Sequence, residues 1–332
     1  MTTDSQTKPI GQKAAAHEKP ADSVISLREE EYTGESESLY TLALRRLRHD
    51  YLSMIAIGIV LVLGAASFLA PVITDALNIS YTRTDSAGFL PIGSAGHILG
   101  TDDLGRDQLA RLLYAGRISL TIATSAAIGS LLIGITIGVI AGYYQGGPLG
   151  FVDDAIMWFV TTLNSIPTLF LLLIVASVMR SQQSALRSSP AVLIVILTLL
   201  GWTGTMRLVR GETLARREFE YTIAARALGA SDRRIMFVHI LPNIYSIIVV
   251  TLAIDIGSLL LVEAALSFLG LGVTPPTPSW GNMLSNAQSF FDRGPHLVVL
   301  PGLLIVVTVL CLYIIGDGLR DAFDPQASKK VA

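Results

Sequence analysis

Six long apolar segments alternate with polar ones along the chain. The first contains no charged side chain and is long enough for a helix to cross the ~30 Å of hydrocarbon in a bilayer. The pattern therefore predicts an all-α polytopic membrane protein with six transmembrane helices. The predicted spans are Met54–Ile73, Ile118–Ala141, Ala155–Met179, Pro190–Met206, Ile244–Leu271 and Leu297–Ile315.

Two of these spans contain residues that affect helix packing. In the second, Gly134, Gly138 and Gly142 recur every four residues on one helix face, which predicts the close approach of a neighbouring helix. In the third, Pro167 lacks a backbone donor and predicts a kink, close to Asn164. The kink can line a translocation path or serve packing alone, and the sequence leaves both interpretations open.

The fifth span contains two carboxylates, Asp255 and Glu263. Asp255 lies on the order of 16 Å into the span, close to the bilayer midplane. A carboxylate there is costly and must face protein or a water-filled cavity. Asp255 is therefore a candidate contact for a positively charged substrate group, such as a peptide amino terminus, and a hydrogen bond between helices is the equal alternative. A structural role is favoured for Glu263.

The polar ends of the chain complete the predicted domain organisation. Residues 1–38 lack a hydrophobic period and predict a disordered cytoplasmic tail. Residues 39–115 are expected to hold a basic amphipathic segment, the first transmembrane helix and an external loop. Residues 116–320 are expected to form the main transmembrane domain of five helices, and residues 321–332 a cytoplasmic tail.

Two polar segments between spans are predicted to be external loops. In the first, Asp102 or Asp103 is expected to cap the helix that follows. A metal site made of these two residues and Asp107 is the weaker alternative, because nothing in the sequence fixes three carboxylates on one centre. In the second, Val273–His296, Trp280 is expected to anchor the chain at the membrane interface.

The polar segment Arg207–Pro242 lies between the fourth and fifth spans. Within it, the stretch Gly211–Leu228 has apolar residues at helical spacing with charged residues between them. This pattern predicts an amphipathic helix.

A turn is predicted immediately after this helix. Gly229 supplies a helix stop that tolerates a positive φ. Ser231 or Asp232 is expected to cap a second short helix, which Pro242 would end. Two short helices that meet at an angle make a compact knob, which a groove on another protein can hold. A helix lying on the membrane surface is the alternative.

The spacing within this segment resembles a known family. Ala224, Ala225, Gly229, Leu241 and Pro242 are spaced as in the coupling loop of the permeases of ABC importers, a loop that docks onto a cytoplasmic ATPase subunit. Four further stretches resemble the dipeptide/oligopeptide/nickel permeases of that family. They are GTDDLGRD at 100–107, EAALSFLGLG at 263–272, the loop at 273–296 and GDGLRDAFDP at 316–325. Two positions depart from the general coupling-loop pattern: Ile223 replaces the usual Glu, and His239 replaces the usual Ile.

The resemblance implies a type I ABC importer fold with cytoplasmic coupling helices, in the bacterial cytoplasmic (inner) membrane. It implies a second, homologous permease, two cytoplasmic ATPase subunits, an extracytoplasmic substrate-binding protein, membrane lipid around the helices and a peptide cargo. Nickel or another small solute is an alternative cargo, and an ATP-independent secondary transporter is the alternative from a different class. The implied coupling residues are Glu218, Tyr221, Ala224, Ala225, Leu228, Gly229, Ala230, Ser231, Leu241 and Pro242. The implied substrate-path residues are Asn164, Pro167 and Asp255.

Composition and missing motifs narrow the function further. The chain is 51% hydrophobic and 15% charged, with a net charge of −2, which fits a membrane protein and offers no basic face for nucleic acid. No phosphate-binding loop, zinc-spaced cluster or nucleophile–base pair is recognisable, and His97, His239 and His296 are scattered. We therefore expect no enzyme, no metal and no cofactor in this chain, with ATP and Mg used by partner ATPase subunits.

The distribution of basic residues predicts the orientation. With six spans and both termini in the cytoplasm, the predicted cytoplasmic segments hold most of the 24 Lys and Arg residues. Because basic residues favour the cytoplasmic side, this arrangement places the segment at 207–242 in the cytoplasm.

Overall fold

The computed structural model describes residues 39–84, 86–94, 96–181 and 189–324. The predicted amino-terminal tail, most of the polar link between the third and fourth spans, and the end of the chain lie outside these residues. The described part is helical and contains no β-strand, apart from two isolated bridges, Ser94 to His97 and Thr101 to Asp107. The all-α expectation agrees with these helices.

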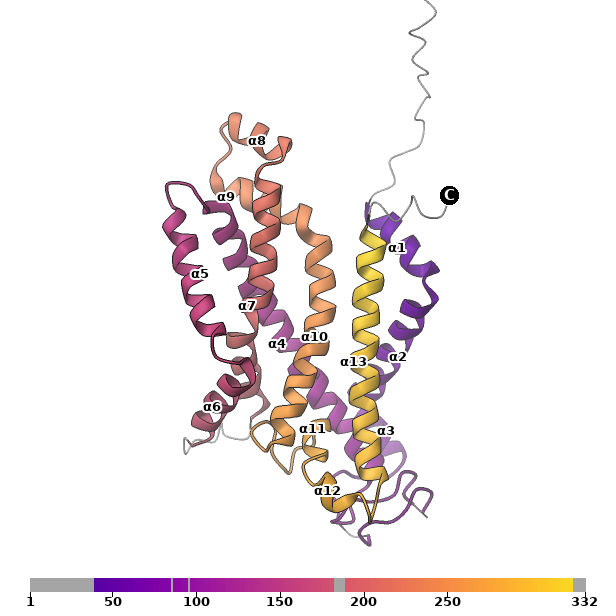
Figure 1. Ribbon diagram of the computed structural model, residues 1–332. Coiled ribbons are helices and arrows are strands. Elements are labelled where there is room, and N and C mark those ends of the chain that lie inside the picture. Colours follow the sequence, from indigo (N-terminus) through magenta and orange to yellow (C-terminus); the bar gives the residue numbers. More distant parts are fainter. Residues whose placement is uncertain (1–38, 85, 95, 182–188, 325–332) are drawn as a thin grey trace, which may run out of the picture. The chain divides into compact units, whose positions relative to one another are not determined.

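Five helices are long and apolar enough to cross a membrane, or six if one sharply bent pair counts as a single span (Figure 1). Four of them are α2 (Tyr51–Phe68), α4 (Gln108–Tyr144), α7 (Pro190–Arg217) and α13 (His296–Phe323), and the fifth is the continuous stretch Asp232–Phe268, which ends in α10 (Tyr245–Phe268). The shorter helices are α1 (Leu39–His49), α3 (Ala70–Ala76), α5 (Gly150–Asn164), α6 (Thr168–Ser181), α8 (Glu220–Ala227), α9 (Asp232–Arg234), α11 (Trp280–Met283) and α12 (Ala287–Phe290).

The predicted third span is broken rather than kinked. Helices α5 and α6 meet at 82°, across the three residues Ser165, Ile166 and Pro167. Proline disfavours helical geometry in the residue before it and donates no backbone hydrogen bond, so the chain turns here. The first turn of α6 then forms on the proline, whose carbonyl accepts from Leu171 N.

Helices α4 and α7 form the centre of the bundle, and the predicted glycine face of α4 is what brings them together. A Cβ atom at Gly134 would lie 2.9 Å from Thr205 Cβ, and one at Gly138 would lie 2.7 Å from the Met206 carbonyl oxygen. Side chains cannot occupy these positions without moving the neighbouring helix, so the predicted close approach is confirmed.

The bent pair α5–α6 contacts α7 near both of its ends. Asp153 at the start of α5 pairs with Arg210 near the end of α7, with two oxygen–nitrogen distances of 2.6 and 2.7 Å. Further along, α6 packs its buried Leu172 against Leu193, near the start of α7. The start of α5 therefore lies near the end of α7, and α6 lies near its start.

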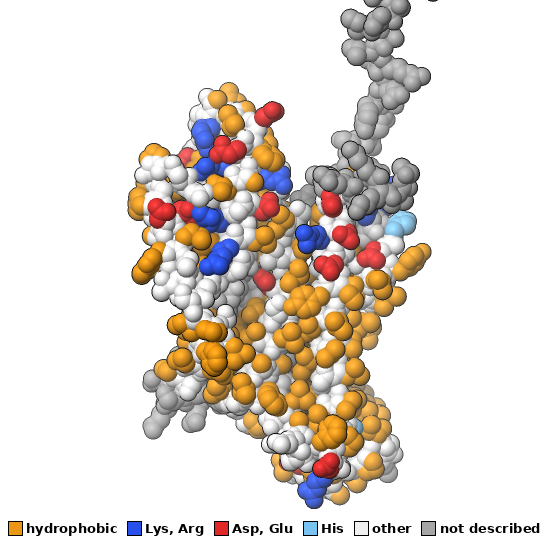
Figure 2. Space-filling model, viewed as in Figure 1, with side chains coloured by type: hydrophobic (Ala, Val, Ile, Leu, Met, Phe, Trp, Pro, Cys, Tyr) orange, Lys and Arg blue, Asp and Glu red, His pale blue; other side chains and the backbone are white. Residues whose placement is uncertain are grey.

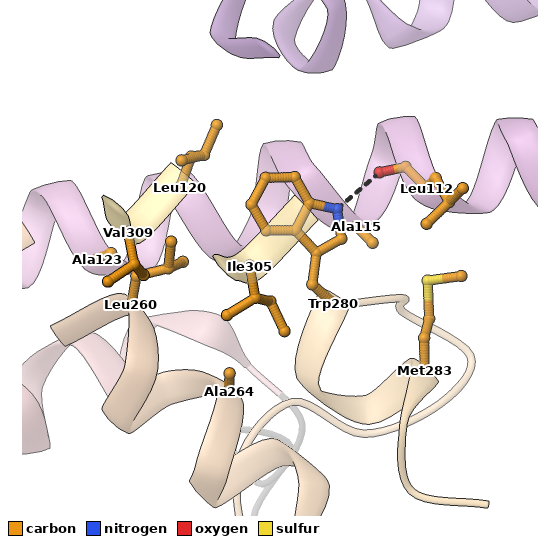
Figure 3. Packing of buried hydrophobic residues seen from close by; sticks show 10 residues of the cluster. All are labelled: Leu112, Ala115, Leu120, Ala123, Leu260, Ala264, Trp280, Met283, Ile305 and Val309. Atoms are coloured by element: carbon orange, nitrogen blue, oxygen red, sulfur yellow. Dashed lines mark hydrogen bonds between the residues drawn. The ribbon is translucent and has the colours of Figure 1, made fainter. Parts of the chain in front are cut away.

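Trp280 lies in the protein core, so the prediction of an interfacial anchor is wrong. Its side chain is only 1% exposed, and its Nε1 donates to the Leu112 carbonyl at 3.1 Å (Figure 3). A capping box between Ser279 and Asn282 holds the single turn of α11 in place. The indole is surrounded by side chains from α4, α10 and α13.

Helix α4 begins at Gln108 and is capped by Asp107, not by Asp102 or Asp103. Asp107 Oδ1 accepts from Ala110 N at 2.8 Å. Asp102 is occupied elsewhere, because its Oδ1 accepts from the backbone N–H groups of Leu104 and Arg106. The three carboxylates of the alternative metal site therefore face different partners and do not converge.

Charged side chains gather at one end of the helices, around α7, α8 and the end of α13, whereas the middle is largely apolar and uncharged on the face shown in Figure 2. A second, smaller charged group lies at the opposite end. An apolar belt between two charged ends is the surface expected of a bilayer-spanning bundle. Helix α13 runs to Phe323, past the predicted domain boundary at residue 320.

Candidate functional site

The amphipathic helix predicted over Gly211–Leu228 is divided between two helices. Helix α7 continues to Arg217, and a separate helix, α8, begins at Glu220. Thr222 explains the break, because its buried side chain donates through Oγ1 to the Arg216 carbonyl at 3.0 Å. Phe219 adopts an extended backbone between the two helices and accepts from Thr222 N.

The end of α8 is a Schellman turn centred on Gly229. Ala230 N donates to the Ala225 carbonyl at 3.0 Å, and Gly229 N donates to the Arg226 carbonyl at 3.0 Å. Gly229 has a φ of +82°, which favours glycine, and a side chain there would meet no atom within 4 Å. The sequence correctly predicted this glycine as the helix stop.

One face of α8 is apolar and uncovered. Ile223, Ala224, Ala227 and Leu228 are all exposed, and Leu228 is 88% exposed. These four residues, which we call the α8 stripe, lie on one face because positions three and four residues apart are helical neighbours. An exposed apolar surface of this kind is typical of a site that binds a protein or a membrane.

The chain after α8 anchors it to the bundle. Helix α9 leads into a π-helical turn, η3 (Ile235–Ile240), a 3₁₀ turn, η4 (Leu241–Ile244), and then α10. The prediction that Pro242 ends a second short helix is therefore wrong. Proline has no backbone N–H group, and Pro242 lies at the start of the 3₁₀ turn, directly after the π-helical turn, where this group is not needed for the helical hydrogen bonds. The helical path therefore continues through Pro242 into the membrane span.

Apolar packing fixes this anchoring segment. Ile235, Ile240 and Ile244 are fully buried against side chains of α4 and α7, including Val139 and Val209. Ala230 and Leu241 pack against the same cluster. The segment after α8 is therefore joined to α4, α7 and α10 by close-packed contacts.

Polar contacts add a second connection between the anchoring segment and α4. Tyr143 Oη donates to Asp232 Oδ1 at 2.7 Å, and the Arg226 guanidinium lies 5.8 Å from the centre of the Tyr143 ring. Arg217 Nη1 donates to the carbonyls of Tyr143 and Gln145, at 3.0 and 2.6 Å. These side chains border a cavity of about 380 Å³ beside α8.

The structure separates the ten predicted coupling residues into two groups. Ala224, Leu228, Gly229 and Ser231 are exposed on α8 and the turn that follows it. The others lie around them: Ala225 and Ala230 close the turn, Tyr221 packs edge-on against Phe219, Glu218 pairs with Arg217, and Leu241 and Pro242 lie in the anchoring segment.

The predicted substrate-path residues do not form one cluster. Asn164 accepts from Thr203 Oγ1 at 3.3 Å, and Asp255 accepts from Thr205 Oγ1 at 2.9 Å. The two threonines are two residues apart on α7, so they point in nearly opposite directions. Pro167 lies exposed in the break between α5 and α6.

His97 has partners that the sequence did not reveal. Its Nδ1 lies 2.8 Å from Asp107 Oδ2, and its Nε2 lies 2.8 Å from Ser86 Oγ. The scattered positions of the histidines along the chain gave no indication of these contacts. The three residues tie the loop at 86–97 to the beginning of α4.

Three contacts that hold the site were missed by sequence reasoning: the Asp153–Arg210 pair, the Tyr143–Asp232 hydrogen bond and the capping contacts of Arg217. The sequence did contain an indication of the Asp153–Arg210 pair. A carboxylate at the edge of an apolar span needs a partner, and Arg210 lies at the equivalent edge of the next span. The other two join residues more than 70 positions apart, so no local pattern predicted them.

Comparison with known proteins gives the family. Residues 134–329 match the binding-protein-dependent transport system inner membrane component family. This chain belongs to that family of transport permeases. The permease is 36% identical over 299 residues to the dipeptide transport system permease protein of Alkalihalophilus pseudofirmus, covering 90% of this chain and 93% of the relative.

Two further relatives extend the comparison. The glutathione transport system permease protein of Pectobacterium atrosepticum is 38% identical over 282 residues, covering 85% of this permease and 89% of the relative. The oligopeptide transport system permease protein of Bacillus subtilis is 33% identical over 300 residues, covering 90% and 94%. The matched region includes α7, α8 and α10, so the candidate site lies inside the family domain.

Proposed function

We propose that this permease is one membrane subunit of an ABC importer that carries peptides, and that α8 is its docking helix for a cytoplasmic ATPase subunit. The α8 stripe is the observation that carries the proposal, because an uncovered apolar helix face on a tightly held tip suits a groove on another protein. The names of the three relatives, which transport dipeptides, glutathione and oligopeptides, support a peptide cargo.

The chemistry of the stripe defines the groove that it fits. Ile223 occupies the position where the family usually has Glu, so this part of the contact is apolar rather than ionic. Leu228, which is 88% exposed, would contribute about 1.5–3 kcal/mol if a partner fully covered it, and Ile223, which is 51% exposed, about half as much. The groove on the ATPase must then be apolar at its centre.

The anchoring segment gives the docked helix a mechanical role. When ATP closes the ATPase pair, a docked α8 moves with its ATPase and moves α4, α7 and α10 through the buried cluster around Ile235 and Ile240. The transmembrane path then alternates between inward-open and outward-open states. ATP can drive this change only if α8 binds differently in the two ATPase states.

The cargo would cross the membrane beside α7 and α10. Asp255 is half-buried on α10, and its charge would attract the amino terminus of a peptide at mid-membrane depth. Asn164 and Pro167 lie on the other side of α7, at the break between α5 and α6. Asp255 is accordingly the stronger candidate for direct contact with the cargo.

Co-purification with the ATPase subunits of the same transporter tests the docking role. Leu228→Asp places a charge on the most exposed residue of the stripe and should reduce ATPase recovery at least tenfold, without changing membrane insertion. Leu77→Asp is the matched control, because Leu77 is an exposed leucine that follows α3, at the opposite end of the helices from α8 (Figure 1). Equal ATPase recovery with both variants would contradict the docking role.

Peptide transport without an ATPase is the result that would favour a secondary transporter over an ABC importer. If the purified permease alone moves peptides across liposome membranes, a secondary transporter is the better description. The proposal expects no movement until the second permease, the ATPases and ATP are added.

A further inference from the structure

Tyr143, in the last turn of α4, contacts the chain on both sides of the turn that ends α8. Its Oη donates to Asp232 Oδ1 at 2.7 Å, and Asp232 is the first residue of α9. The centre of its ring lies 5.8 Å from the guanidinium of Arg226, in the last turn of α8. Gly229 lies between these two contacts in the sequence. A single residue of α4 therefore holds both flanks of the turn.

The rest of Tyr143 is fixed to the bundle. Its side chain is buried and packs in the apolar cluster that contains Ile235. Its backbone carbonyl accepts from Nη1 of Arg217, the last residue of α7, which also donates to the carbonyl of Gln145. The ring cannot move alone, so a shift of α9 either breaks the bond to Asp232 or displaces the end of α4.

The hydroxyl group gives this contact its direction. Apolar packing of the ring is non-directional, whereas a hydroxyl that donates to a carboxylate makes a strong and directional hydrogen bond. A cavity of about 380 Å³ borders the contact, between Arg226, Asp232 and the turn from α4 to α5. Without the hydrogen bond, α8 and α9 would have room to tilt into this cavity.

We infer that Tyr143 is a positioning residue for coupling, whose bond to Asp232 holds α8 at one angle to α4. A displacement of the docked helix then displaces α4, instead of being lost in a tilt of α8. The inference rests on the proposed function, in which α8 docks onto the ATPase. It requires no contact between Tyr143 and the ATPase or the cargo.

Tyr143→Phe removes the hydroxyl and keeps the ring in its cluster. Peptide import and ATP hydrolysis are measured together in liposomes that contain the assembled transporter and its binding protein. Peptides imported per ATP hydrolysed should fall about fivefold or more, while ATPase recovery stays within about twofold of the unmodified permease, because the α8 stripe is unchanged. Tyr144→Phe is the matched control, because it removes a hydroxyl from the adjacent residue, which does not bind Asp232.

Variants of Asp232 test whether the bond itself is responsible. Asp232→Asn keeps an acceptor for the hydroxyl and should retain more coupling than Asp232→Ala. Tyr143→Phe combined with Asp232→Ala should lose no more coupling than Tyr143→Phe alone, because both changes remove the same bond. Additive losses would overturn the inference.

Two further outcomes of Tyr143→Phe would also overturn it. Unchanged import per ATP would mean that the hydroxyl does not contribute to coupling. A loss of ATPase recovery would mean that the hydroxyl serves folding or docking itself. The proposed docking role fails separately, if the unmodified permease recovers no ATPase.

Discussion

Single residues decide how closely the central helices approach and where charge lies in the membrane. Gly138 on α4 lies against the backbone of α7 at Met206, and any residue with a side chain at this position would force the two helices apart. Asp255 lies on the neighbouring α10 and is bound to Thr205 of α7. Both features were recognisable in the sequence, because a glycine repeat and an intramembrane carboxylate are rare and costly unless they have a partner.

Gly138→Ala should destabilise the permease by about 1–3 kcal/mol, because the added methyl group would lie 2.7 Å from the Met206 carbonyl oxygen and 2.9 Å from Val209 Cβ. A lower midpoint of thermal unfolding in detergent would show this. Gly204→Ala is the control, because a Cβ atom at Gly204 would meet nothing within 4 Å. Equal stability of the two variants would contradict the proposed close contact.

Asp255→Asn should reduce the uptake of dipeptides that have a free amino terminus by about five- to tenfold, which corresponds to about 1–1.4 kcal/mol of binding. Uptake of the same dipeptides with an acetylated amino terminus should change little. Thr205→Val removes the hydroxyl donor but leaves the charge, so it should preserve the preference. If Thr205→Val is the more damaging change and Asp255→Asn affects both peptide classes alike, Asp255 serves helix packing.

At the scale of elements, the sequence predicted which segments are helical better than where they end. Apolar periodicity continues from α7 through α8, so the break at Phe219 is invisible to it. The break depends on the Thr222 hydroxyl bonding back to the Arg216 carbonyl. In the same way, Pro242 suggests a helix end, but the π-helical turn before it lets the helical path continue. Boundaries set by a single side-chain contact cannot be predicted from periodicity.

The Schellman turn after α8 can be tested as an element. Gly229→Val forces a β-branched residue to a φ of +82°, at a cost of about 1–2 kcal/mol or more, which should loosen the end of α8 and lower ATPase recovery about tenfold. Gly229→Asn tolerates this backbone geometry and should retain most of the recovery. Because open space surrounds the position, equal effects of Val and Asn would argue against a role for the turn.

At the scale of the whole molecule, the all-helical architecture and the order of the apolar segments were predictable, but the way the loops pack was not. Trp280 illustrates the difference. Its position in a polar loop suggested the membrane interface, and yet its indole completes the core between α4, α10 and α13. Such contacts join residues more than 160 positions apart, so no local pattern contains them.

The six-span arrangement follows if the bent pair α5–α6 crosses the membrane. Gly147→Cys between α4 and α5 and Ala227→Cys on α8 should then react with a membrane-impermeant thiol reagent from the same, cytoplasmic side, because α5–α6 and α7 both cross between them. Labelling of intact and inside-out vesicles in a Cys311→Ala background measures this. Reaction of the two cysteines from opposite sides would mean that α5–α6 does not cross.

The most direct test of the docking role is a site-specific cross-link from α8. Leu228→Cys in a Cys311→Ala background carries a benzophenone maleimide, and the assembled transporter is irradiated before the products are separated. Docking predicts an adduct between the permease and an ATPase subunit, and none from Ser285→Cys at the opposite end. An adduct from Leu228→Cys with lipid alone, in a transporter that still hydrolyses ATP and imports peptide, would contradict it.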